Sequence, residues 1–239
     1  MRNTFRRKTV KMSVADYILD AIISRELRPG TRILESQMAN SLGVAKTTLR
    51  EALIDLERQG VLMGSDNRGT YVTELTGEDV RDIYGVRIKL EPEAGVLAHR
   101  RISAPEQAEL ATLLERMRAA GLRKDYLNAQ KADLAFHQLI WNVSGNLALE
   151  KALNAVSVPM FAFSGLYLLQ RFAANPSDYA RICNDHAAML KVLKEGPPEK
   201  VRKVFEDKLE VFEEENWAVA GKLDSGRNQE RHAVQQGTI

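Results

Sequence analysis

Cysteine and long apolar runs are almost absent from this sequence. Cys183 is the single cysteine among 239 residues, so no intrachain disulfide can form and a zinc ribbon would lack its second thiolate. No segment reaches the roughly 18 consecutive apolar residues that a membrane span requires. The first residues, MRNTFRRKTVKMS, also lack the apolar core of a secretory signal. We therefore expect a protein without membrane segments that resides in the reducing cytoplasm.

Sequence motifs of common enzyme classes are missing as well. The chain contains no glycine-rich phosphate loop, no GxSxG nucleophile motif and no HExxH zinc motif. Apolar residues make up 44% and charged residues 28% of the sequence, which is typical of folded globular proteins. The sequence thus predicts a folded protein that is not an enzyme, with enough residues for one large domain or two modest ones.

Positive charge is concentrated at the start of the chain. Residues 1–75 contain 12 Lys and Arg against 9 Asp and Glu, whereas the remaining residues contain 22 against 23. The first eleven positions hold Arg2, Arg6, Arg7, Lys8 and Lys11. No acid accompanies these cations, so residues 1–12 are interpreted as a basic arm. Such an arm favours solubility and also suits a polyanion such as DNA, because each neutralised phosphate releases counterions.

Three helices followed by a hairpin are predicted for residues 13–75. Apolar residues recur at helical spacing in residues 13–27, 35–42 and 45–59. Gly43 separates the second helix from the third, and Gly60 follows the third, as glycine often does at helix ends. Beyond Gly60, two short runs of strand-forming residues flank a polar loop and indicate a hairpin. This order of elements predicts a winged helix-turn-helix domain.

Polar side chains on the third predicted helix suit the recognition of DNA. Lys46, Thr47 and Arg50 fall on the face opposite the apolar stripe. Lys and Arg can donate to guanine O6 and N7, and Thr can donate to a phosphate or contact a thymine methyl group. In the wing loop, Arg68 adds a cation, and Gly69 permits close approach of the backbone to a groove or phosphate. Each residue alone is typical of a solvated surface, but their combined order favours a DNA-binding domain.

Three segments in this region carry a family resemblance. PGTRI, GVAKTTLREALIDLERQGV and RGTYV closely resemble the amino-terminal winged helix of the GntR family of bacterial transcription regulators. The implied DNA contacts are Lys46, Thr48, Arg50 and Gly69, with Ser36 and Gln37 as further candidates. The family usually has arginine where this chain has Lys46, so a two-pronged contact to guanine becomes a contact by a single point charge.

The remaining chain is predicted to form an all-α domain over residues 76–220. Helical patterns run over residues 78–102, 104–120, 123–143, 146–173, 178–195 and 198–220. Glycine and proline breaks separate these patterns, and the short connections favour antiparallel neighbours in a bundle. The tail, residues 221–239, is polar and aperiodic and is expected to be disordered. The predicted fold class is therefore mainly α, with a winged helix-turn-helix followed by an antiparallel helical bundle.

Asp133 and His137 are four residues apart on one predicted helix, so both side chains share a face. The spacing fits either a hydrogen bond on the helix surface or two ligands of one cation. DLAFHQLIWNVSGN, together with NDHAAMLKVLKEG and VRIKLEPEAGVLA, resembles the FCD effector domain of FadR-type GntR regulators. This resemblance implies a divalent metal held by an aspartate and three histidines, of which Asp133, His137 and His186 are present.

The fourth ligand of that set is replaced by a lysine. Lys208 stands where the resemblance places the last histidine, and its ordinary pKa of about 10.4 makes it a cation that repels a metal. Two outcomes follow: a weakly held Zn²⁺ or Ni²⁺ on the three remaining ligands, or no metal, with the ammonium paired to Asp133. We favour the second outcome and expect no tightly bound metal.

The resemblance also implies regulation by an effector. A cavity with positive character suits a small organic acid, and Arg87 and Lys208 are the predicted effector contacts; Arg87 could instead pair with Glu91 on the helix surface. The protein is expected to act as a homodimer on a palindromic operator in double-stranded DNA. Two alternatives stay open: a constitutive DNA-binding repressor with a degenerate pocket, and a metal-dependent enzyme with a DNA-targeting module, which the missing motifs disfavour.

Overall fold

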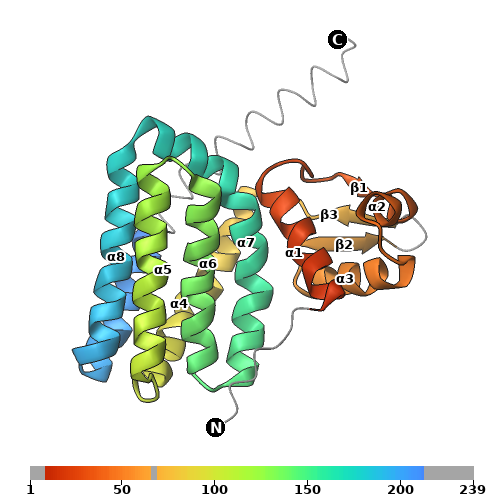
Figure 1. The fold of residues 1–239 in the computed structure, drawn as a ribbon. Coiled ribbons are helices and arrows are strands. Elements are labelled where there is room, and N and C mark those ends of the chain that lie inside the picture. The colour runs from red at the N-terminus through yellow and green to blue at the C-terminus, as the bar shows by residue number, and fades with distance from the viewer. Residues whose placement is uncertain (1–8, 66–68, 213–239) are drawn as a thin grey trace.

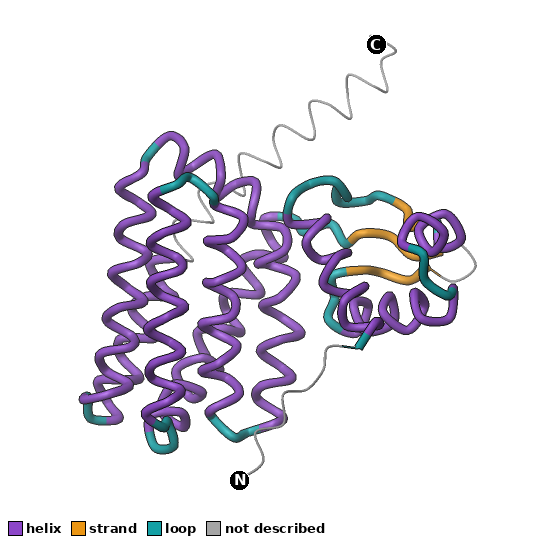
Figure 2. Tube along the Cα trace, viewed as in Figure 1, coloured by secondary structure: helices purple, strands orange, loops and turns teal. Residues whose placement is uncertain are grey.

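A computed structural model describes residues 9–65 and 69–212 of the chain. A small unit at the amino-terminal end lies beside a larger helical bundle (Figure 1). Within the described residues, strands occur only in the small unit (Figure 2). The predicted class, a winged helix-turn-helix followed by an all-α domain, is confirmed. Residues 1–8 of the predicted arm, Arg68 and the predicted tail lie outside the described residues.

The small unit contains three helices and three short strands. The helices are α1 (Val10–Ile23), α2 (Glu35–Leu42) and α3 (Lys46–Arg58), and the strands are β1 (Arg32–Ile33), β2 (Leu62–Ser65) and β3 (Gly69–Val72). The strands are antiparallel in the order β1-β3-β2. Gly43 has φ 63 at the end of α2, a left-handed conformation that glycine adopts without strain. The chain can therefore turn sharply from α2 into α3.

The first helix and the sheet differ from the sequence prediction. Helix α1 begins at Val10 because the Thr9 side chain accepts a hydrogen bond from the Met12 backbone N–H and caps the helix. It ends at Ile23, shortly before Arg25, which has φ 68. The sheet has the additional strand β1, which is only two residues long. So short a strand has no detectable periodicity, and the predicted two-stranded wing is in fact part of a three-stranded sheet.

The larger unit is a bundle of long helices. These are α4 (Gly77–His99), α5 (Ala104–Leu122), α6 (Tyr126–Val143), α7 (Leu147–Ala174) and α8 (Pro176–Glu195), and residues 198–212 are also helical. Reciprocal capping hydrogen bonds between a hydroxyl residue and an acid start α4 and α5. Helix α5 packs against α6 and α8, and α6 packs against α7 (Figure 1). No described helix combines the length and apolar character that crossing a membrane requires.

The two units share one hydrophobic core. Apolar side chains of α1, α3 and the sheet pack together with side chains of α7, and α1 lies against α7 (Figure 1). Arg25 Nη2 donates a hydrogen bond to the Phe163 backbone oxygen at 2.9 Å. Lys131 of α6 forms an ion pair of 2.6 Å with Asp20 of α1. Apolar packing and polar contacts therefore both hold the small unit against the bundle.

Candidate functional site

The outer face of α3 carries polar side chains at its amino-terminal end. Lys46, Thr47 and Arg50 are exposed, and Thr48 is partly buried. The buried stripe of the same helix consists of Leu49, Ala52, Leu53 and Leu56. The side chains thus have the orientation that helical spacing predicted, with the apolar stripe anchored in the core. The contact of these residues with DNA stays a prediction.

The start of α2 lies against the start of α3. Ser36 Oγ accepts a hydrogen bond from Lys46 Nζ at 3.0 Å, and Glu35 Oε2 accepts one from Arg50 Nε at 2.6 Å. Ser36 and Gln37 are both exposed, so the predicted DNA contacts of α2 and α3 share one surface. Sequence reasoning missed Glu35, which partly neutralises Arg50. This ion pair is solvent-accessible, so a phosphate or a base edge can compete for the guanidinium at small cost.

The wing of the sheet brings a further arginine to the same unit. Gly69 has φ 100, and a Cβ atom at this position would lie 3.1 Å from Arg32 Nε. Arg32 is exposed and belongs to β1, which pairs with β3 opposite Tyr71. Arg32 could not be identified as a candidate from the sequence because its position beside the wing depends on the pairing of β1, which no local pattern indicated.

A second group of polar side chains lies inside the bundle. Asp133 and His137 belong to α6, His186 to α8, and Lys208 to the helical residues 198–212. One ligand atom each from Asp133, His137 and His186 lies within 4.8 Å of the others. Lys208 Nζ lies 3.0 Å from His137 Nε2 and 3.1 Å from His186 Nε2. The structure therefore brings together the three predicted ligands and the lysine that replaces the fourth.

The partners of the two imidazoles determine which nitrogen carries a proton. His137 Nε2 lies 3.0 Å from Lys208 Nζ, and an ammonium can only donate, so Nε2 accepts and the proton of the neutral imidazole is on Nδ1. This Nδ1 lies 3.2 Å from Glu91 Oε2, but neither of the two atoms makes a hydrogen bond of good geometry within the described residues. His186 Nδ1 donates to the Ile182 backbone oxygen at 2.7 Å. Its Nε2 lies between Lys208 Nζ and Asp133 Oδ1, which is 2.8 Å away. Asp133 Oδ1 can only accept and Lys208 Nζ can only donate, so this Nε2 can hydrogen-bond to one of the two groups at a time.

Burial and neighbouring charges shift the pKa values in this cluster. Burial, supported by the charge of Lys208, lowers the pKa of His137 to about 4. Burial also lowers the pKa of Lys208 to about 8. Burial alone would raise the pKa of Asp133, but the neighbouring His186, His137 and Lys208 outweigh it and hold that pKa well below its usual range. At neutral pH the cluster therefore combines a neutral His137, a carboxylate and an ammonium.

Arg87 lies beside the cluster in a buried ion pair. Its Nε donates to Glu91 Oε1 at 2.6 Å, and the two side chains are 3% and 1% exposed. The ion pair between Arg87 and Glu91, which their spacing of four residues allowed, is therefore present, but it lies inside the bundle rather than on a helix surface. The guanidinium carbon also lies 5.1 Å from the Tyr84 ring centre and 5.4 Å from that of Phe161. Burial alone would raise the pKa of Glu91, but the charge of Arg87 outweighs it and lowers that pKa to about 2.

The cluster lines a hollow that is nearly filled. The hollow has a volume of about 30 Å³ and is bordered by Met160 and Phe161 of α7 in addition to the polar side chains. This volume holds one or two water molecules, so an organic acid can enter only if side chains move. Its positive character is also less than expected, because Glu91 and Asp133 offset the charges of Arg87 and Lys208.

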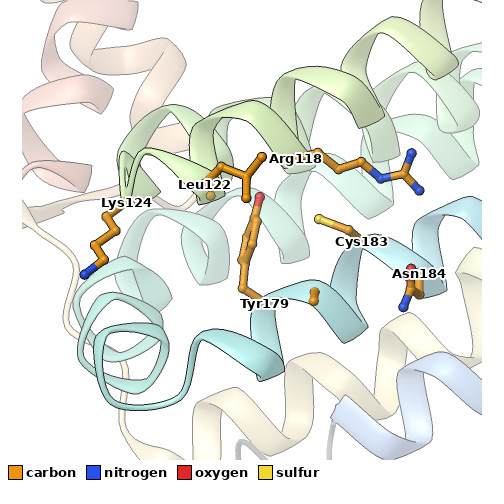
Figure 3. A pocket seen from close by; sticks show the side chains of 8 residues that line it. Arg118, Leu122, Lys124, Tyr179, Cys183 and Asn184 are labelled. Atoms are coloured by element: carbon orange, nitrogen blue, oxygen red, sulfur yellow. The ribbon is translucent and has the colours of Figure 1, made fainter.

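A larger hollow of about 400 Å³ lies between α5 and α8. Leu122, Tyr179 and Cys183 contribute to its lining (Figure 3). The charged ends of Arg118 and Lys124 point away from each other at its two sides (Figure 3), so they do not converge on a common ligand. This hollow offers mainly apolar surface, whereas the buried cluster offers converging polar groups, and we take the cluster as the candidate ligand site.

Both units of the chain match known protein families. Residues 11–72 match the bacterial regulatory proteins of the gntR family, and residues 82–210 match the FCD domain. The chain belongs to the GntR family. The GntR match contains the helices α2 and α3 with their exposed polar face, and the FCD match contains all members of the buried cluster.

Individual relatives of this GntR protein are transcriptional regulators by name. The uncharacterized HTH-type transcriptional regulator YdhC of Bacillus subtilis is 33% identical over 141 residues, which cover 57% of this chain and 61% of that protein. The gluconate operon transcriptional repressor of Bacillus licheniformis is 24% identical over 94% of this chain and 93% of its own length. The solved structure of Escherichia coli McbR/YncC superimposes with a TM-score of 0.74 at 24% identity, covering 90% and 98% of the two chains. This structural likeness shows the fold of the chain.

The metal-ligand set implied by the FCD resemblance is incomplete in this GntR regulator. Asp133, His137 and His186 converge, but Lys208 Nζ occupies the space that both Nε2 atoms face. A metal would lie about 2.0–2.2 Å from each ligand atom, so it would have to share this space with a cation. The residues present therefore do not fit a divalent ion. The expectation that no metal is tightly bound stays a prediction.

Proposed function

We propose that this GntR regulator binds a palindromic operator as a cytoplasmic homodimer, and that a small organic acid bound in the helical bundle controls its operator affinity. The observation that carries this proposal is the exposed polar face of Lys46, Thr47 and Arg50 at the start of α3, in a chain whose second unit is an FCD domain. Helix-turn-helix proteins place this end of the recognition helix in the major groove.

The surface formed by α2 and α3 suits both base and backbone contacts. Arg50 has the planar fork that binds guanine O6 and N7, whereas Lys46 acts as a point charge for a guanine or a phosphate. Ser36, Gln37 and Thr48 can donate to phosphates beside the groove. Arg32, next to Gly69, adds positive charge at the wing. Two copies of this surface would read two half-sites about one helical turn apart.

Helix α7 connects the candidate ligand site with the DNA-binding unit. Met160 lines the hollow, and its sulfur accepts a hydrogen bond from Arg87 Nη1 at 3.1 Å. The neighbouring Pro159 packs near Gly60 at the end of α3, and Phe163 bonds to Arg25 after α1. An acid that opens the hollow moves this part of α7 and thereby the support of α1 and α3. A coupling of ~1–3 kcal/mol would change operator affinity about 5- to 150-fold.

A constitutive repressor is the second candidate. It is favoured by the small volume of the hollow and by the balance of its charges. Such a repressor binds the operator through the same surface of α2 and α3, but no small acid changes its operator affinity. The reported relatives are named as regulators, so the alternative of an enzyme has no support from them.

The experiment starts from duplexes selected by the purified protein out of a random DNA pool. Fluorescence anisotropy then measures the affinity for the selected duplex with and without a panel of small mono- and dicarboxylates, and sedimentation gives the number of chains bound. We expect a selected palindrome, two chains per duplex, and a change of at least about 5-fold with one acid. Unchanged affinity with every acid favours the constitutive repressor, and failure to select any duplex contradicts the proposed function as a whole.

Replacing Glu35 with glutamine is expected to raise operator affinity. The variant keeps the size of the side chain but removes the carboxylate that accepts from Arg50 at 2.6 Å. An exposed ion pair is worth about 0.2–1 kcal/mol, so we expect up to about 5-fold tighter binding for each half-site. Anisotropy with the selected duplex measures this, and the exposed Glu51→Gln substitution on α3 is the matched charge control. Weaker binding by Glu35→Gln would show that Glu35 instead holds Arg50 in its binding position.

A further inference from the structure

We propose that the Lys208 ammonium permanently replaces the divalent ion of an FCD ligand set, so that this bundle is completed by its own cation and takes up no metal. The inference concerns the interior of the bundle and does not depend on the proposed operator or effector. It is based on two observations: three metal-ligating side chains converge, and the Lys208 ammonium lies within hydrogen-bond distance of two of them.

The two imidazoles already have partners at the atoms a metal would use. Lys208 Nζ lies 3.0 Å from His137 Nε2 and 3.1 Å from His186 Nε2, distances typical of hydrogen bonds rather than of metal coordination. An ammonium can only donate, so the Nε2 lone pair of His137 accepts from Lys208. The lysine therefore satisfies the nitrogen that would otherwise require a metal.

The lysine is held in this place by its own helix. Val201, Phe205 and Leu209 are all buried and anchor the helical residues 198–212 in the bundle core. Lys208 Nζ also lies 5.8 Å from the centre of the Phe212 ring, so an aromatic face stabilises the cation from one turn further along. The side chain would have to leave several favourable contacts before a metal could enter.

The charges of the buried cluster balance without a metal. Asp133 and Glu91 supply two carboxyl groups, and Lys208 and Arg87 supply two basic groups, so the formal charges of these four residues cancel. A divalent ion would add two positive charges next to an ammonium in an environment of low dielectric constant, where unbalanced charge is costly. Replacing Lys208 with a neutral residue that can coordinate a metal, such as histidine, would remove the repelling charge and restore the fourth ligand.

The test compares three forms of the full-length chain: the natural protein, Lys208→His and Lys208→Met. Each is incubated with Zn²⁺ or Ni²⁺ and dialysed, and its metal is counted by plasma mass spectrometry. We expect far less than one ion per chain in the natural protein, close to one in Lys208→His, and an intermediate amount in Lys208→Met, which removes the cation but supplies only a weak thioether ligand in place of the imidazole. Urea unfolding midpoints should rise most with Zn²⁺ in Lys208→His and should not rise in the natural protein.

One tightly held ion per chain in the natural protein would overturn the inference. So would a folded Lys208→His variant that takes up no more metal than the natural protein. Circular dichroism shows whether the variants fold. If Lys208→His does not fold, a Zn²⁺ titration of the natural protein tests the inference instead. No binding supports the inference, and stoichiometric binding refutes it. DNA binding is not measured in this test, so failure here is separate from failure of the proposed function.

Discussion

Alanine in place of Arg50 is expected to abolish specific operator binding at concentrations where the natural protein is saturated. Arg50 is exposed on α3, and its hydrogen bond to Glu35 uses Nε rather than the terminal nitrogens of the guanidinium. A two-pronged contact between arginine and guanine contributes about 1–3 kcal/mol. A dimer makes this contact twice, so the loss amounts to about 2–6 kcal/mol, or roughly 30- to 20,000-fold in affinity.

Arg58→Ala is the matched control for this substitution. It removes the same charge from the same helix, and Arg58 is 76% exposed with a loose 3.6 Å contact to Asp55. It lies about 12 Å further along α3, away from the end that enters the groove. Anisotropy with the selected duplex should show near-natural affinity for Arg58→Ala, and the selectivity over unrelated duplexes should fall only in Arg50→Ala. Equal losses in both variants would mean that α3 contributes net charge and does not read bases.

Arg87→Ala is expected to destabilise the bundle by about 3–5 kcal/mol, because it leaves a buried carboxylate without its cation. Arg87 and Glu91 are nearly inaccessible to solvent and are joined at 2.6 Å. The arginine also fills space between the rings of Tyr84 and Phe161. Urea unfolding followed by circular dichroism measures the change in the free energy of unfolding.

The double variant Arg87→Met with Glu91→Leu separates charge from packing. It removes both charges and keeps most of the volume, so its stability should lie within about 1–2 kcal/mol of the natural protein. A double variant as unstable as Arg87→Ala would show that the ion pair is not the main cause. This result would also identify the hydrogen bond from Arg87 to Met160 and the ring contacts as the larger contributions.

The destabilisation by Arg87→Ala should depend on pH in a defined direction. The pKa of Glu91 in the natural protein is about 2, below its ordinary 4.5, so its contribution to stability is present above pH 4.5 and is lost as the pH falls towards 2. In the variant, burial without the cation raises this pKa. The difference in unfolding free energy between the two proteins should therefore be largest above the raised pKa of Glu91 in the variant, and it should narrow as the pH falls from that value, which is above 4.5, towards 2.

The helices and the polar face of α3 could be read from local patterns. Apolar residues at helical spacing predicted α2 and α3 within one residue of their observed ends, and Gly43 marked the turn between them. Asp133 and His137 were placed on one helix face by their spacing alone. These features depend on residues within a few turns of one another, because helix periodicity and capping act over that range. The start of α1 was misplaced because the cap at Thr9 lay in a segment interpreted as an arm.

The sequence by itself determined the order of helices, the exposed cationic start of α3 and the shared face of Asp133 and His137, and its resemblance to the FCD domain added His186 and Lys208. Only the tertiary structure decided that Lys208 contacts both His137 and His186, that Arg87 and Glu91 are buried, and that Glu35 pairs with Arg50. The physical reason is that each of these depends on how separate elements pack: Lys208 and His137 are 71 positions apart in the chain. Periodicity shows which face of a helix is apolar, but only packing of that face shows which charges become buried together.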